Sequence, residues 1–167
     1  MSTHSNTKML SEADSYDLLR RFNVPAPVFE IVTNPESAAA AAAKIGYPVV
    51  MKIVSPQIIH KSDAGGVILG VKTDDEAKAA YNTIISSVKT YNPDAEIKGI
   101  IVEEMAKSGL ELIIGGKIDP AFGRVITFGL GGTLVEFHKD VGIRIFPCTD
   151  YEIHSLINRS KDINSSQ

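Results

Sequence analysis

The chain has 167 residues, 44% hydrophobic and 22% charged, which is the composition of a folded globular protein and excludes a disordered tail. Its net charge of -3 leaves no basic excess to hold a nucleic acid, so any phosphate site must be local. The lone Cys148 excludes disulfide frameworks and multi-cysteine zinc sites. Because the sequence has no long apolar run and no signal-type start, we expect a cytoplasmic protein, neither secreted nor membrane-inserted.

Caps, breaks and the spacing of apolar residues predict an alternation of helices and strands. Ser11 and Asn34 are predicted N-caps, Pro35 suits a first helical turn, and Gly46 stops the second helix. The predicted elements are a helix over 11–22, a strand over 28–32, a helix over 35–45, strands over 48–55 and 67–72, a helix over 74–88, strands over 97–105, 110–117, 123–130 and 141–146, and a helix over 149–159. No linker separates independent domains, although two lobes could share the chain.

Local signals also fix how some of these elements begin and connect. Thr73 with Glu76, and Thr149 with Glu152, have the spacing of capping boxes at helix starts. The polar, glycine-bearing loop over 56–66 joins two strands, which predicts a hairpin with a long tip.

Lys52 is the first anomaly, because it stands in an otherwise apolar strand. Such an ammonium either reaches water at a sheet edge, which the residue alone favours, or meets a buried anion. The loop over 60–67 follows, where Gly65 and Gly66 would let backbone N–H groups approach an anion. The combination suggests a phosphate site of neither Walker nor dinucleotide type, although a tight hairpin is the simpler explanation of the glycines alone.

His60 lies in the same loop and has two interpretations. It is either a solvated bystander, which the residues alone favour, or a nucleophile whose neutral nitrogen accepts a phosphoryl group near pH 7. Metal binding is disfavoured, because His4, His138 and His154 are scattered without a ligand spacing.

Two carboxylates close the next apolar strand, and a third follows it. Adjacent side chains on a strand point to opposite faces, so Glu103 or Glu104 is expected to enter a cleft. Glu111, eight residues after Glu103, could face the same cleft and accept two hydrogen bonds from a diol such as a ribose. Solvent-facing carboxylates at a sheet edge explain the spacing equally well.

A third group consists of Glu136, Asp140 and Arg144, which recur at intervals of four. On a helix, residues with that spacing would share one face, but Gly142 and its β-branched neighbours favour a loop and a strand. Arg144 is then either a second phosphate clamp or part of a surface salt bridge.

Taken in order, the segments from residue 10 to 160 resemble one family. The matching segments are VVMKIVS (49–55), HKSDAGGV (60–67), IIVEEMA (100–106), ELIIGG (111–116), DPAF (119–122), FGLGG (128–132) and VE…KD…R…P (135–147). Together they are similar to the ATP-grasp domain in the β subunits of ADP-forming acyl-CoA synthetases, such as archaeal acetyl-CoA synthetase. Succinyl-CoA synthetase β subunits are similar more distantly.

The resemblance implies an α/β ATP-grasp fold of two lobes with mixed or antiparallel sheets, the second lobe being incomplete. The N-terminal lobe would span 24–104, and the other lobe 10–23 together with 105–160. Residues 1–9 and 161–167 would be flexible ends.

The resemblance also implies a nucleotide, ATP or ADP, clamped between the lobes. Lys52 would hold the α/β-phosphates under the glycine loop, Glu103 would lie near the adenine edge, and Glu111 would bind the ribose. The implied nucleotide-binding residues are Lys52, Gly65, Gly66, Glu103, Glu104, Met105 and Glu111.

In this family the histidine of the HKSD segment transfers phosphoryl groups, which makes His60 and Arg144 the candidate catalytic residues. Acyl-CoA and phosphate would form an acyl phosphate on an α-type, CoA-binding partner subunit, whose own histidine takes up the phosphoryl group. His60 would relay it to ADP, making the chain part of a hetero-oligomeric acid–thiol ligase. No nucleic-acid or membrane partner is expected.

Mg²⁺ is the implied cofactor. Family members continue to an E-x-D-I-N-P segment that binds it, whereas this sequence ends at Gln167. Asp162-Ile163-Asn164 follows the last helix too early and has Ser next, so we expect the metal ligands to be missing. The alternative function is therefore a non-catalytic or truncated nucleotide-binding module.

Overall fold

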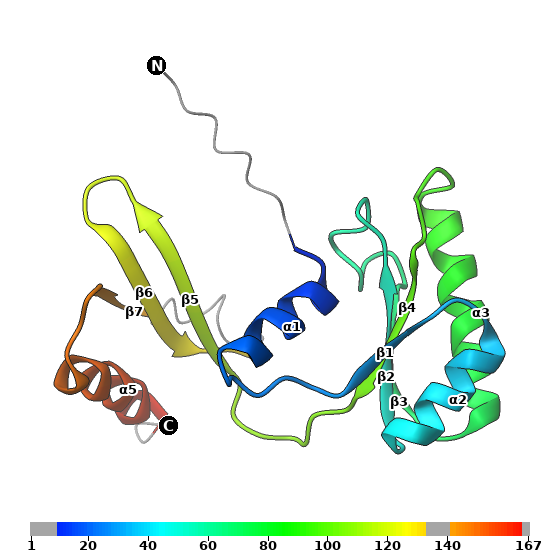
Figure 1. Cartoon of the computed structure of the whole chain (residues 1–167), viewed down its shortest axis with the longest axis horizontal. Helices are drawn as coiled ribbons and strands as arrows, with labels where there is room; N and C mark the ends of the chain where they lie inside the picture. Colours follow the sequence, from blue (N-terminus) through cyan, green and yellow to red (C-terminus); the bar gives the residue numbers. More distant parts are fainter. Residues whose placement is uncertain (1–9, 133–140, 165–167) are drawn as a thin grey trace. The chain divides into compact units, whose positions relative to one another are not determined.

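The computed structural model describes residues 10–132 and 141–164, and the chain divides into two compact units, Met1–Lys107 and Ser108–Gln167 (Figure 1). Within the described ranges, no helix is both long and apolar enough to cross a bilayer.

A four-stranded antiparallel sheet organises the first unit. Its strands, in the order β1-β4-β2-β3, are β1 (Phe29–Val32), β4 (Gly99–Glu104), β2 (Val49–Val54) and β3 (Val67–Val71). β2 and β3 form the predicted hairpin, with Lys52 opposite Val67. β2 and β4 are the two inner strands, so their side chains have neighbours on both sides.

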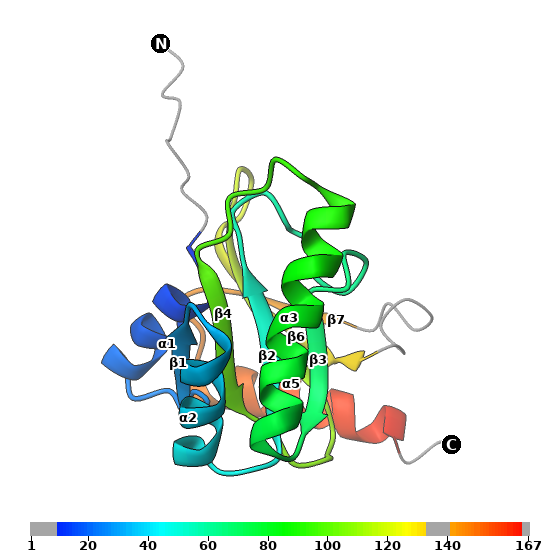
Figure 2. The same cartoon turned by 90° about the vertical axis from the view of Figure 1, so that its right-hand side faces the viewer.

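Two helices, α2 (Pro35–Ile45) and α3 (Asp74–Tyr91), cover one face of this sheet (Figures 1 and 2). The predicted caps form: Asn34 accepts a hydrogen bond from the Ser37 amide at 2.8 Å, and Thr73 accepts one from the Glu76 amide at 3.2 Å. The start of α3 differs from the predicted capping box, because the Glu76 carboxylate accepts its hydrogen bond from the amide of Lys72, one residue before the N-cap.

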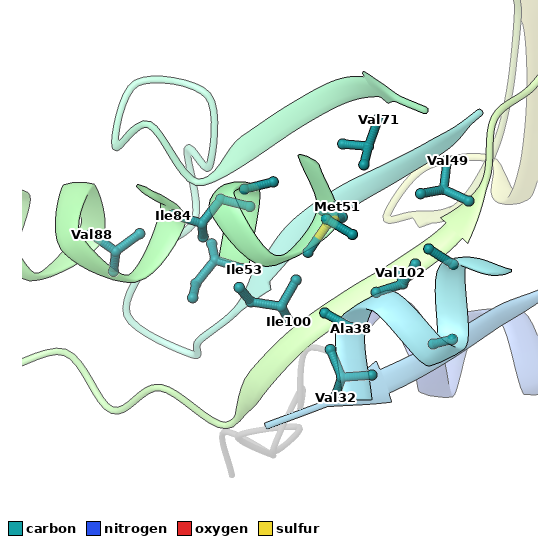
Figure 3. Packing of buried hydrophobic residues seen from close by; sticks show 14 of the residues in the cluster. Val32, Ala38, Val49, Met51, Ile53, Val71, Ile84, Val88, Ile100 and Val102 are labelled. Carbon is teal, nitrogen blue, oxygen red and sulfur yellow. The ribbon is translucent and has the colours of Figure 1, made fainter. Parts of the chain in front are cut away.

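The core lies between the sheet and these helices. Met51 and Ile53 of β2 and Ile100 of β4 pack with Ile84 and Val88 of α3, all fully buried (Figure 3). Because side chains alternate along a strand, the residues between them project from the opposite face. That second face carries Val50, Lys52, Ile101 and Glu103.

Helix α1 (Glu12–Arg21) lies on the second face of the sheet (Figure 1). Its Tyr16 ring packs against Phe29 of β1, with ring centroids 5.3 Å apart. The apolar side chains Leu18, Leu19 and Phe22 are exposed, whereas Glu12 and Tyr16 of α1 face the sheet. This places residues 10–23 in the first unit, whereas we expected them with the second lobe.

The second unit holds an antiparallel sheet in the order β5-β6-β7 and one helix. The elements are β5 (Leu112–Asp119), β6 (Gly123–Leu130), β7 (Val141–Ile145) and α5 (Asp150–Asn164). Helix α5 packs on β6 and β7, where Gly142 makes room for Leu156. Residues 161–164 continue α5 instead of forming a flexible end, while 1–9 and 165–167 lie outside the described residues. The α/β class with two antiparallel sheets is confirmed.

Candidate functional site

Lys52 lies on an inner strand, so the edge-strand interpretation is wrong and the buried-anion interpretation is confirmed. Lys52 is opposite Ile101, which places Glu103 on the same face one pleat further along β4. The Lys52 ammonium forms an ion pair with Oε1 of Glu103, whose residue is only 5% exposed. Burial opposes the ammonium, but the hydrogen bonds and charges of Glu103 and Glu12 outweigh it and raise the pKa of Lys52.

A second carboxylate, Glu12 of α1, completes this ion-pair network. Its Oε1 lies 2.7 Å from the Lys52 ammonium, and its Oε2 contacts the ammonium of Lys61. Burial by itself would raise the pKa of Glu12, but hydrogen bonds from Lys52 and Lys61 and their charges lower it to about 2. Glu12 is therefore ionised at neutral pH and bridges two cations.

The Tyr16 hydroxyl joins the two carboxylates. It lies 2.9 Å from Oε1 of Glu12 and 2.9 Å from Oε2 of Glu103, and its single proton can be donated to either. Burial, followed by these two hydrogen bonds and the carboxylate charges, raises the pKa of Tyr16 far above its usual value. The neutral hydroxyl thus remains a donor throughout the physiological pH range.

Replacing Tyr16 by phenylalanine should test this hydrogen bond. The ring contact with Phe29 can persist, but the buried Glu103 carboxylate loses a donor, and we expect the free energy of unfolding to fall by about 1.5–3 kcal/mol. Urea unfolding measures the change. Tyr91→Phe, at a tyrosine that is 59% exposed, is the control and should change stability by less than about 0.5 kcal/mol. Equal effects of the two substitutions would contradict a role for the Tyr16 hydroxyl.

The glycine pair has a clear packing role in this structure. A Cβ on Gly65 would lie 2.8 Å from Cβ of Ser87, and one on Gly66 would lie 2.6 Å from Cγ2 of Ile53. Their amides donate within the loop, from Gly65 to the Ser62 carbonyl and from Gly66 to the Lys61 carbonyl. Binding of phosphate by these amides stays a prediction, and it would require the loop to release them.

Three other predicted site residues in the first unit are exposed: His60, Glu104 and Met105. Glu104 points away from buried Glu103, as strand alternation predicts, and its amide donates to the Val28 carbonyl at 2.9 Å. The His60 imidazole has no hydrogen-bond or ion-pair partner within the described residues, so it is accessible to a reactant.

The second unit contributes Glu111 and Arg144. Glu111 is exposed, and its backbone carbonyl accepts a hydrogen bond from the Gly131 amide at 2.7 Å. A Cβ on Gly132 would lie 3.2 Å from Oε2 of Glu111, so the FGLGG turn lies directly against this glutamate. The Arg144 guanidinium donates to the Ile143 carbonyl at 2.9 Å. Glu136 and Asp140 lie outside the described residues.

A Mg²⁺ site needs several oxygen ligands gathered at one place. Within residues 10–132 and 141–164, no cluster of three or more acidic, histidine or cysteine side chains is arranged to hold a metal ion. Without a nucleotide, the described residues therefore do not form a complete set of protein ligands for Mg²⁺.

The sequence did not reveal three members of the network: Glu12, Tyr16 and Lys61. Glu12 and Tyr16 are four residues apart and so share a helix face, which was the available signal. That signal was obscured by the apolar face of the same helix. Lys61 is next to His60, but a lysine in a polar loop gives no indication of an anionic partner.

Comparison with known proteins gives a family match over nearly the whole chain, because residues 2–165 match an ATP-grasp domain. The chain is 50% identical over 148 residues to a 4-hydroxybutyrate–CoA ligase (ADP-forming) of Nitrosopumilus maritimus. It is 44% identical over 157 residues to the β subunit of acetate–CoA ligase (ADP-forming) I of Pyrococcus furiosus. Among solved structures, acetyl-coenzyme A synthetase 1 of Candidatus Korarchaeum cryptofilum, in complex with coenzyme A and Ca-AMPCP, superposes with a TM-score of 0.87 at 41% identity.

These relatives are longer than the chain. The match covers 89% of the chain but 21% of the Nitrosopumilus ligase, and 94% of the chain and 68% of the Pyrococcus subunit. For the Korarchaeum structure it covers 92% of the chain and 67% of the solved one.

Proposed function

This chain belongs to the ATP-grasp family, and we propose that it binds ADP or ATP as the nucleotide-binding part of an ADP-forming acyl-CoA synthetase. The observation that carries this proposal is the placement of Lys52. Its ammonium projects from an inner strand, is fixed by buried Glu103, and lies on the sheet face away from α2 and α3. A lysine held in this way presents a positioned positive charge to a phosphate group.

The remaining nucleotide contacts are proposed from the family resemblance. Lys52 would hold the α/β-phosphates beneath the Gly65–Gly66 loop, and the strand end from Glu103 to Met105 would border the adenine. Glu111 would accept hydrogen bonds from the ribose hydroxyls, for which its exposed carboxylate is suited.

His60 is the proposed phosphoryl carrier. A neutral imidazole nitrogen attacks the phosphorus of a phosphoryl donor on the partner subunit, forming a P–N bond as the bond to the donor breaks. A terminal β-phosphate oxygen of ADP then attacks the same phosphorus, which breaks the P–N bond and yields ATP. Arg144 would stabilise the charge on the transferring group.

The partner is proposed to be a CoA-binding, α-type subunit, which would make the assembly a hetero-oligomer in the cytoplasm. Support comes from the relatives, since the Pyrococcus protein is named as a β subunit. The partner would form the acyl phosphate from acyl-CoA and phosphate, and it would select the acyl group.

Titration calorimetry of this chain with ADP, with and without Mg²⁺, tests the proposal. We expect ADP to bind with a dissociation constant between about 1 µM and 1 mM, the usual range for metabolite sites. Binding that is indifferent to Mg²⁺ would support the alternative of a nucleotide-binding module without catalytic competence. Absence of binding to ADP and ATP under both conditions would overturn the proposed function.

A further inference from the structure

The carboxylate of Glu12 occupies a position between two lysines. One oxygen, Oε1, lies 2.7 Å from the Lys52 ammonium, and the other, Oε2, contacts the ammonium of Lys61. Two ammonium groups bridged by a single oxyanion form a two-point anion site, which adjacent oxygens of a phosphate group could fill in the same way.

Lys61 connects this anion site with the proposed chemistry. It follows His60 directly in the loop between β2 and β3, whereas Lys52 lies on β2. One cation of the pair therefore lies on the proposed phosphate-binding strand, and the other is next in sequence to the proposed phosphoryl carrier. Lys61 is only partly exposed, so its side chain is held over the sheet and not extended into solvent.

The charges of the network already cancel, which disfavours binding of a further anion beside Glu12. Lys52 and Lys61 supply two positive charges, while Glu12 and Glu103 supply two negative ones. A nucleotide phosphate placed here would meet the Glu12 carboxylate as a like charge in a partly buried site, which is unfavourable. Glu103 is buried on an inner strand, whereas Glu12 begins a helix that has no buried residue, so Glu12 is the carboxylate that can leave.

The position of Glu12 in α1 makes its departure feasible. No residue of α1 is buried, and Glu12 is the first residue of the helix. The helix is held further along, where Arg20 lies over the Phe29 ring at 5.1 Å and donates to the Pro27 carbonyl at 2.6 Å. The first turn can therefore shift while these later contacts hold the rest of the helix.

We propose that Lys52 and Lys61 together form the phosphate site of this chain, and that Glu12 is an internal anion that fills the site until a nucleotide phosphate displaces it. The inference rests on the proposed nucleotide-binding function and adds Lys61 as a second phosphate-binding residue. It makes α1 a competitor of the nucleotide, so nucleotide binding releases the first turn of α1 from the sheet.

Calorimetric titration of the whole chain with ADP, and with adenosine as the ligand without phosphates, tests the inference. Glu12→Gln removes the competing charge and should tighten ADP binding by about tenfold, with no change for adenosine. Lys61→Met should weaken ADP binding by about tenfold. The matched control is Asp17→Asn, which removes an exposed carboxylate from the same helix and should leave ADP binding within about twofold.

The outcomes separate this inference from the function on which it rests. If the wild-type chain binds ADP and Glu12→Gln binds it equally or more weakly, or Lys61→Met binds it equally, the inference is overturned and the nucleotide-binding function stands. If neither the wild type nor Glu12→Gln binds ADP, the proposed function itself fails and the inference with it. An independent readout is the side-chain carboxyl carbon signal of Glu12 in the wild-type chain at pH 7. ADP should shift this signal and leave that of Asp17 in place, and an unmoved Glu12 signal at saturation would also overturn the inference.

Discussion

Lys52→Met is expected to lower the free energy of unfolding by about 3 kcal/mol, because it leaves the buried Glu103 carboxylate without its cation. Methionine preserves most of the side-chain volume, so the loss reflects charge and not a cavity. Breaking a buried ion pair typically costs about 3–5 kcal/mol. We expect a loss near the lower limit, because the Lys52 side chain is still 22% exposed. Urea unfolding at pH 7 gives the measurement.

A matched surface pair supplies the control. Lys44 pairs with Glu30, but its side chain is 75% exposed, so Lys44→Met should change stability by less than about 1 kcal/mol. The double variant Lys52→Met/Glu103→Gln should recover part of the loss, because it removes both charges of the pair. A Lys52→Met variant no less stable than Lys44→Met would contradict a buried ion pair at this position.

His60→Ala should abolish ATP formation from acyl-CoA, phosphate and ADP in the enzyme assembled with its CoA-binding partner. If His60 carries the phosphoryl group, its removal deletes the nucleophile, and we expect turnover to fall by at least about a thousandfold. ADP binding and stability should be unchanged, since the imidazole is exposed and has no partner among the described residues. A steady-state assay of ATP formation, together with calorimetry of ADP binding, gives both quantities.

The chain offers its own control for this experiment. His154 is another exposed histidine, on α5, and His154→Ala should leave turnover unchanged. Normal turnover of the His60→Ala enzyme would refute the relay. Equal losses in both variants would indicate damage to the assembly and would also argue against a specific role for His60.

Much of the secondary structure could be predicted from the sequence, because the signals for it act over a few residues. Asn34 caps α2, Gly46 ends it with φ of 103°, and Thr149 with Glu152 forms the capping box before α5. Each of these contacts joins residues at most four positions apart. The ends of α3 and α5 were predicted less well, since a helix that packs on a sheet can extend beyond its apolar pattern.

From the residues alone it follows that Lys52 is unusual, that Glu103 and Glu104 point to opposite faces, and that the chain resembles the ATP-grasp family. Which of these groups contact one another depends on the three-dimensional fold. Glu103 contacts Lys52 because β2 and β4 pair in a register that no local signal specifies, and Glu12 reaches both lysines because α1 docks with Glu12 and Tyr16 facing the sheet. Strand register and helix docking depend on packing between residues 40 or more positions apart, so the network at this site could not be predicted from periodicity and capping.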